Sequence, residues 1–108
     1  RHAVFEREGS NLFARVPISF TTAALGGTID VPGLDREHRE FRIPAGIQTG
    51  KQLRKRGAGM PVLNARGTGD LVIEVEVETP TRLTSRQKEL LEEFRATDPT
   101  DGVAAAQS

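Results

Sequence analysis

The sequence of 108 residues contains no cysteine, tryptophan or tyrosine, and each absence narrows what the chain can do. Without cysteine it can form neither a disulfide nor a thiolate zinc site, and it has no thiol nucleophile. This composition fits a reducing compartment, and we expect a cytoplasmic protein. Because five phenylalanines are the only aromatic residues, Val, Ile and Leu must fill most of the core, which favours strands with aliphatic faces.

Net charge and long hydrophobic runs are missing as well. Fifteen basic residues balance fifteen acidic ones, so no overall field draws the chain to nucleic acid or to an anionic membrane, and we expect neither as a partner. No run approaches the roughly 18 apolar residues of a membrane span, and the first residues lack the apolar stretch of a signal peptide. The chain begins with Arg1 rather than Met, and we expect it to be a piece of a longer protein.

Alternating apolar and polar residues predict that most of the chain is β-strand. In the clearest example, residues 70–79, Leu71, Ile73 and Val75 share one face with Val77, whereas three glutamates share the other. A second strand is predicted over 12–20, where Pro17 indicates an edge-compatible or bulged end. Shorter strands are expected over 28–31, 40–43 and 52–56, with a short strand or connector over 4–8, one helical turn over 21–25 and a charged loop over 35–39.

Short strands with Gly or Pro about every ten residues are typical of a small sandwich or open barrel. We therefore predict a mainly β fold, a small two-layer β-sandwich of short antiparallel strands with one α-helix at its C-terminal end.

A helix is predicted from Ser85 to about Arg95, because Thr84 and Gln87 have the spacing of a capping box. Isolated helices of this length are marginal in water. Its apolar stripe must therefore cover a surface, either of its own sandwich or of another subunit. The stripe consists of Leu83, Gln87, Leu90, Leu91 and Phe94.

Three patterns could carry chemistry, and each has a simpler interpretation. The basic run 51–56 could bind phosphate, but cross-strand pairing with the glutamates of 70–79 is favoured. Gly57 and Gly59 are favoured as a turn over a nucleotide-binding motif, since a following helix and a third glycine are missing. His38 beside Asp35 and Glu37 is favoured as part of a solvated loop over a metal or acid–base site. We predict no catalytic residue, no bound metal and no enzyme activity.

Apolar strand residues usually form the core, and that is the favoured interpretation for this chain. Leftover apolar surface beside an open strand edge can nevertheless receive an extended peptide as an added strand. The candidate residues for peptide binding are Ala14, Val16, Ile29, Val31 and Ile73.

Several short motifs follow one another in a distinctive order: Val16-Pro17-Ile18-Ser19-Phe20, Ala23-Ala24-Leu25-Gly26-Gly27, Ile43-Pro44-Ala45-Gly46, Arg56-Gly57-x-Gly59-Met60-Pro61 and Leu83-Thr84-x-x-Gln87-x-x-Leu90-Leu91. Over about residues 2–95 the chain resembles the C-terminal region of DnaJ co-chaperones. The charged stretch 34–39 departs from the Leu-Asp-Gly turn that is usual in that family.

The resemblance implies a division of the chain: a connector from a missing first β-domain over 1–11, a second C-terminal β-domain over 12–80, a dimerisation helix over 81–96 and a flexible tail over 97–108. It also implies a homodimer that pairs through the apolar stripe and binds unfolded or partly folded polypeptides. The full-length protein would stimulate the ATPase of a DnaK-type chaperone through a J-domain and could hold zinc, both outside this chain, which itself needs no cofactor. The alternative is a structural spacer and dimerisation module, with client binding confined to the missing first β-domain.

Overall fold

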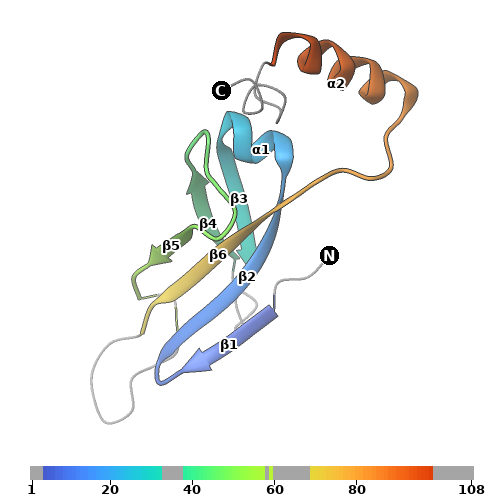
Figure 1. Cartoon of the computed structure of the whole chain (residues 1–108). Coiled ribbons are helices and arrows are strands. Elements are labelled where there is room, and N and C mark those ends of the chain that lie inside the picture. Colours follow the sequence, from blue (N-terminus) through green and yellow to red (C-terminus); the bar gives the residue numbers. More distant parts are fainter. Residues whose placement is uncertain (1–3, 33–37, 58, 60–68, 99–108) are drawn as a thin grey trace, which may run out of the picture.

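The computed structural model describes residues 4–32, 38–57, 59 and 69–98, and these form two sheets and two helices (Figure 1). A four-stranded sheet has the order β1-β2-β6-β5, and β3 and β4 form a two-stranded sheet. In chain order the elements are β1 Val4–Glu8, β2 Asn11–Ser19, α1 Phe20–Leu25, β3 Gly27–Pro32, β4 His38–Ile43, β5 Gln52–Lys55, β6 Leu71–Glu78 and α2 Ser85–Thr97. The predicted mainly β fold with a C-terminal helix is confirmed.

The core lies between the two sheets, where the apolar faces predicted from the alternation meet. Every second residue of β2, from Leu12 to Ile18, is buried against the odd-numbered residues of β6. The two-stranded sheet contributes Val31, Phe41 and Ile43 from the other side. Phe5 and Leu53 pack at the margins of this cluster. Each fully buried aliphatic side chain stabilises the fold by about 1.5–3 kcal/mol relative to an exposed one.

The pairing of β2 with β6 is parallel, which differs from the antiparallel sandwich predicted. The other three pairings are antiparallel. Parallel neighbours need a long connection, and here α1, the β3–β4 hairpin and β5 lie between the two strands. Burial accounts for the arrangement, because these two central strands carry the longest aliphatic faces.

Pro17 lies within β2 and does not end it. The backbone N–H of Leu12 donates to Asp70, so the even-numbered residues of β2 direct their hydrogen-bonding groups toward β6 and the odd-numbered residues direct theirs away. The described pairing with β1 on that other side ends at Arg15. An N–H at position 17 would point to the β1 side, where the described pairing has already ended. Proline, which has no N–H, therefore costs β2 no hydrogen bond of that pairing.

Two predicted boundaries differ from the structure. β4 begins at His38, since His38 and Arg39 pair with Pro32 and Val31, so the charged loop predicted over 35–39 was wrong at those two positions. Charged side chains suit a strand when one face of its sheet is in water. Residues 35–37 lie outside the described residues. At the other end α2 extends to Thr97, and most of the predicted tail also lies outside them.

Gly26 ends α1 and fixes how the β3–β4 sheet begins. Its φ is 81°, and its N–H donates to the carbonyl of Thr22 at 2.8 Å. A Cβ at this position would lie 3.0 Å from the backbone nitrogen of Ala45 and from the carbonyl oxygen of Ile43. Only glycine combines this left-handed conformation with so close an approach of another backbone.

Candidate interaction surfaces

The capping box predicted for α2 is present. The Thr84 hydroxyl accepts a hydrogen bond from the Gln87 N–H at 3.1 Å, and the Gln87 side-chain oxygen accepts one from the Thr84 N–H at 2.9 Å. Two of the four backbone N–H groups that have no partner within the helix at its start are thereby satisfied. The helix is locally specified even though it gains little from burial.

α2 lies apart from the sheets, beyond α1, at the end of an extended segment that follows β6 (Figure 1). None of its thirteen residues is buried. Leu90 is 47% exposed and Phe94 is 54% exposed, and Leu83 just before the helix is also exposed. An apolar stripe this open is unusual on a short helix, which normally depends on tertiary packing for its stability.

Phe94 joins α2 to the rest of the chain through a contact between aromatic rings. Its ring meets that of Phe20 edge to face, with 6.4 Å between the ring centroids. Such a pair contributes about 0.5–1.5 kcal/mol beyond its buried area. The sequence left open whether the stripe covers its own sandwich or another subunit, and the single chain covers only part of it.

A groove of about 600 Å³ separates α2 from the end of β2 and the segment after β6. We call it the α2 groove. It brings together four of the five residues predicted for dimerisation, whereas Phe94 lies beside it against Phe20. The lining residues used below are Phe20, Leu83, Gln87, Leu90 and Leu91. Phe20 was missed from the sequence, because one apolar residue at a strand–helix junction has no periodic signal.

The residues predicted to bind peptide lie mainly inside the core. Ala14, Val16, Val31 and Ile73 are all buried, and Ile29 is partly buried against them. They are brought together in space, but between the sheets. A peptide could reach the four buried side chains only if the sheets parted. Their role in peptide binding stays a prediction.

The charged patterns noted in the sequence form ordinary surface contacts. His38 Nδ1 lies 2.7 Å from an oxygen of Asp30 across the β3–β4 hairpin, with both side chains more than half exposed. Within the described ranges no group of three or more His, Asp or Glu side chains could hold a metal ion. From the basic run, Lys55 bonds to the Glu40 carbonyl and lies 5.2 Å from the Phe41 ring centroid. These contacts join the two sheets.

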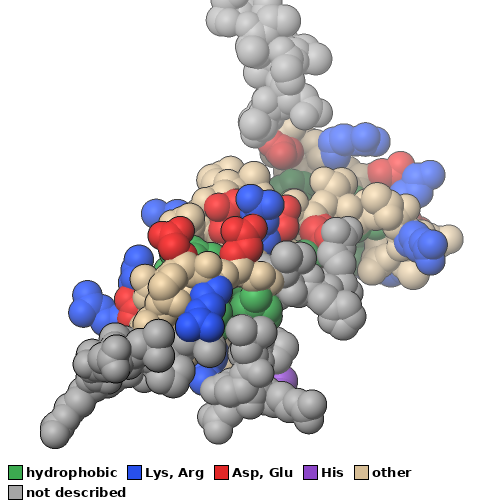
Figure 2. Space-filling view, turned by 90° about the horizontal axis from the view of Figure 1, so that it is seen from below, with side chains coloured by type: hydrophobic (Ala, Val, Ile, Leu, Met, Phe, Trp, Pro, Cys, Tyr) green, Lys and Arg blue, Asp and Glu red, His purple; other side chains and the backbone are tan. Residues whose placement is uncertain are grey.

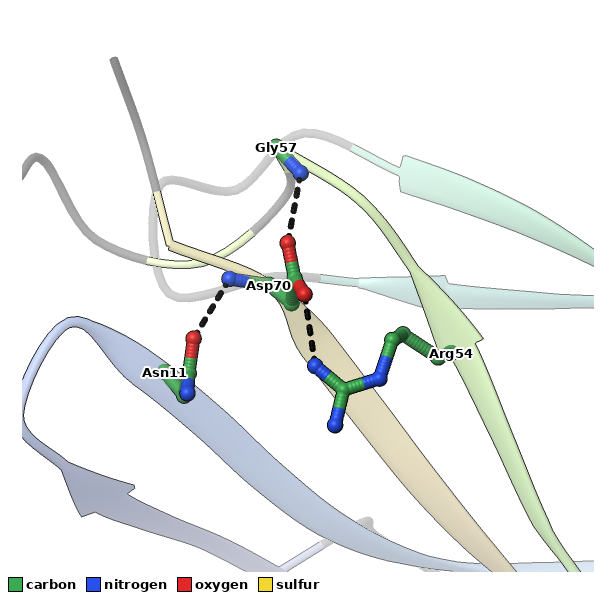
Figure 3. A network of polar contacts seen from close by, with 4 residues as sticks. All are labelled: Asn11, Arg54, Gly57 and Asp70. Carbon is green, nitrogen blue, oxygen red and sulfur yellow. Dashed lines mark hydrogen bonds and ion pairs between the residues drawn. The ribbon is translucent and has the colours of Figure 1, made fainter. Parts of the chain in front are cut away.

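Asp70 is the centre of a polar network where β2, β5 and β6 meet (Figure 3). One carboxylate oxygen accepts a hydrogen bond from Arg54 at 2.5 Å, and the other accepts one from the Gly57 N–H at 3.2 Å. The Asp70 N–H donates to the Asn11 side chain at 2.8 Å. The basic run was expected to pair with the glutamates of β6, but Arg54 pairs with Asp70 and Glu74 lies 4.0 Å from Arg15.

These contacts lower the pKa of Asp70 below its ordinary value of 3.8, chiefly through the hydrogen bond from Arg54 and then that from Gly57. A carboxyl group whose pKa is lower in the folded chain than in the unfolded chain adds stability above the unfolded pKa and loses it as pH falls through the folded value. Asp70 therefore stabilises the fold at neutral pH, and this contribution disappears in acid.

Asp70→Asn is expected to lower the midpoint of thermal unfolding at pH 7, because the charge that Arg54 and Gly57 stabilise is removed. The difference from the parent chain should shrink as pH falls below the ordinary value of 3.8 and the Asp70 carboxylate becomes protonated. Circular dichroism melts over this pH range measure it. Glu76→Gln, on the exposed side of β6, is the matched control and should show a smaller difference at pH 7. An Asp70→Asn difference that stays constant with pH would contradict the network's electrostatic role.

Charges of both signs are interspersed over the surface seen from below, with hydrophobic side chains visible only in small areas between them (Figure 2). This matches the zero net charge of the sequence. Among the described residues no helix has the length and apolar character needed to cross a membrane.

Comparison with known proteins gives one consistent result. Residues 1–80 match the family described as the DnaJ C terminal domain. A protein of Zymomonas mobilis named "Chaperone protein DnaJ" is 70% identical over 97 residues, which cover 90% of this chain and 26% of that protein. Proteins of the same name from Cereibacter sphaeroides and Azorhizobium caulinodans are 59% and 55% identical, over 86% and 93% of this chain and 24% and 26% of their own lengths. The chain spans about a quarter of the length of these curated relatives.

Proposed function

Because the chain belongs to the DnaJ C-terminal domain family, we propose that it is the part of a co-chaperone that holds unfolded polypeptide and pairs two copies of the protein. The relatives are named as chaperones, and a role in binding needs no catalytic group. The longer protein would work in the cytoplasm and deliver clients to a DnaK-type chaperone through a J-domain outside this chain.

The exposed apolar stripe on α2 is the observation that supports pairing of two copies of the protein. Leu90 and Phe94 are each about half exposed, and a second copy of α2 would remove both from water. The α2 groove beside them offers Phe20, Leu83 and Leu91 as further contact area. A homodimer would explain why a short helix with no buried residue keeps a complete capping box.

The proposed binding of unfolded polypeptide is supported by less exposed surface. Of the five candidate residues, four are buried and Ile29 is partly buried. The alternative function, a spacer and dimerisation module whose clients bind only the missing first β-domain, is therefore favoured by a specific observation, the burial of Ala14, Val16, Val31 and Ile73.

Titration of the isotope-labelled chain with an uncharged, leucine-rich peptide separates these two functions. If the chain holds polypeptide between or beside its sheets, amide shifts should cluster at Val16, Ile29, Val31 and Ile73. A peptide of the same length composed of serine and glycine is the control and should cause none. No shift at millimolar leucine-rich peptide would favour the spacer.

A further inference from the structure

Val72 departs from the pattern of its own strand. Leu71, Ile73 and Val75 project from β6 into the core, and the even-numbered residues face outward with Glu74 and Glu76. Val72 is on this outward side, yet it is only 3% exposed. Of the buried hydrophobic residues in the described part of the chain, it alone is not in the core cluster.

A hollow of about 230 Å³ opens on this side of the four-stranded sheet, and we call it the outer hollow. Its apolar lining residues are Ala14, which belongs to the core cluster, and the pair Phe13 and Val72, which lie opposite each other across β2 and β6. Small-molecule pockets usually run from about 300 Å³ upward. The outer hollow is below that range and suits one large side chain of a polypeptide.

Acidic side chains dominate the rim of the outer hollow. Glu6 and Glu8 project from β1 on one side, and Glu74 projects from β6. Arg15 is the one cation among the lining residues, and its Nε lies 4.0 Å from a carboxylate oxygen of Glu74. Within the described ranges neither Glu6 nor Glu8 forms an ion pair. The rim therefore has a negative field that attracts cationic groups.

We infer that the outer hollow binds an extended polypeptide segment in which one large apolar residue is flanked by Lys or Arg. The apolar side chain covers the partly exposed ring of Phe13, which lies beside the already buried Val72. Burial of this ring against the ligand supplies the apolar part of the affinity. In an extended segment the side chains at i−2 and i+2 lie about 7 Å to either side of residue i on the same face. Cations at those positions reach the rim, where Glu6 and Glu8 supply the selectivity.

This inference rests on the proposed holding of polypeptide and names the class of segment that is held. The proposed binding surface differs from the one predicted from the sequence, because Phe13 and Val72 lie on the opposite face of the sheet from Ala14 and Val16. The outer hollow is reached without parting the two sheets. It is therefore open to a peptide even if the core residues are never exposed.

The test uses three peptides that share a central phenylalanine and differ only at the two flanking positions, which carry Lys, Gln or Glu. Titrations followed by amide shifts should rank them Lys, then Gln, then Glu in affinity, with shifts at Phe13, Arg15, Val72 and Glu74. Glu6→Gln with Glu8→Gln should weaken the Lys peptide about fivefold, as expected for loss of two exposed ion pairs. The same variant should leave the Gln peptide unchanged.

Glu92→Gln with Glu93→Gln on α2 removes the same charge from another surface and should leave the Lys peptide's affinity unchanged. Equal affinity for all three peptides would overturn the inference. So would a titration with the Lys peptide in which the amide shifts of the protein are confined to residues outside the outer hollow. If the leucine-rich peptide of the earlier titration binds while none of these three binds at the outer hollow, only the inference fails. If no peptide binds anywhere, the proposed polypeptide holding fails with it.

Discussion

Leu90→Asp combined with Phe94→Asp is expected to turn a dimer into a monomer. Both side chains are about half exposed in the single chain, and we propose that a second copy buries them. Each aspartate would place a charge without a partner in an apolar contact, which costs about 3 kcal/mol or more. Each substitution should therefore weaken pairing about a hundredfold. Light scattering across a dilution series measures the change, against a single-chain mass of 11.8 kDa.

A matched control adds the same two charges to the other face of the helix. Ser85→Asp with Ala96→Asp changes two exposed positions outside the apolar stripe, and this variant should keep the parent's dimer mass. Circular dichroism of both variants checks that α2 remains helical. The pairing role of α2 is wrong if the stripe variant and the parent have the same dimer mass. A parent chain that is monomeric at all concentrations would refute pairing in this fragment outright.

Gly69→Ala is expected to destabilise the fold strongly, although it adds only one methyl group. A Cβ on Gly69 would collide with the carbonyl group of Ser10, in the turn between β1 and β2. Gly59 is crowded in the same way, since a Cβ there would lie 2.6 Å from the carbonyl oxygens of Ser10 and Asp70. These are backbone atoms next to the ends of strands and not the far ends of flexible side chains, so they cannot rotate away. Overpacking of this kind costs about 2 kcal/mol, or roughly 10 °C in the midpoint of thermal unfolding of a domain this size.

Gly9→Asn provides the comparison, because Gly9 lies in the same turn with a φ of 62° and open space around its Cβ position. Asparagine tolerates this left-handed conformation, so the melting temperature should change little. Similar melting temperatures for Gly69→Ala and the parent chain would show that the turn can move away from β6 at little cost.

Residue alternation predicted the strands well, because burial on one face of a sheet imposes period two regardless of the neighbours. The alternation of Leu71, Ile73 and Val75 specified which face of β6 is buried, but it carried no information about which strand lies alongside or in which direction. The parallel pairing with β2 was missed for that reason. His38 and Arg39 were assigned to a loop because of their charge, although an exposed strand face accepts such residues readily.

The sites were predictable to different degrees. The apolar stripe of α2 follows from helical spacing and a capping box, both of which are local in sequence. Asp70 could not be recognised, because one aspartate before a strand looks like any turn residue until Arg54 and Asn11 approach from elsewhere in the chain. Val72 could not be recognised from the sequence for a related reason. Glu74 and Glu76 on the same side of β6 indicated that this side faces water. Only the pairing of β2 with β6, which places Phe13 opposite Val72, shows that it also has an apolar area.

The parallel contact between β2 and β6 also sets the order in which the chain can fold. Asn11 and Asp70, which meet where these strands begin, are separated by 59 residues, so the central pair must close a long loop before it gains any burial. The β1–β2 and β3–β4 hairpins can form earlier, as soon as each has left the ribosome. Until β6 follows, the aliphatic face of β2 has no partner strand and is exposed to other chains. A protein segment whose relatives are named as chaperones thus passes through a stage of synthesis in which it resembles an unfolded client.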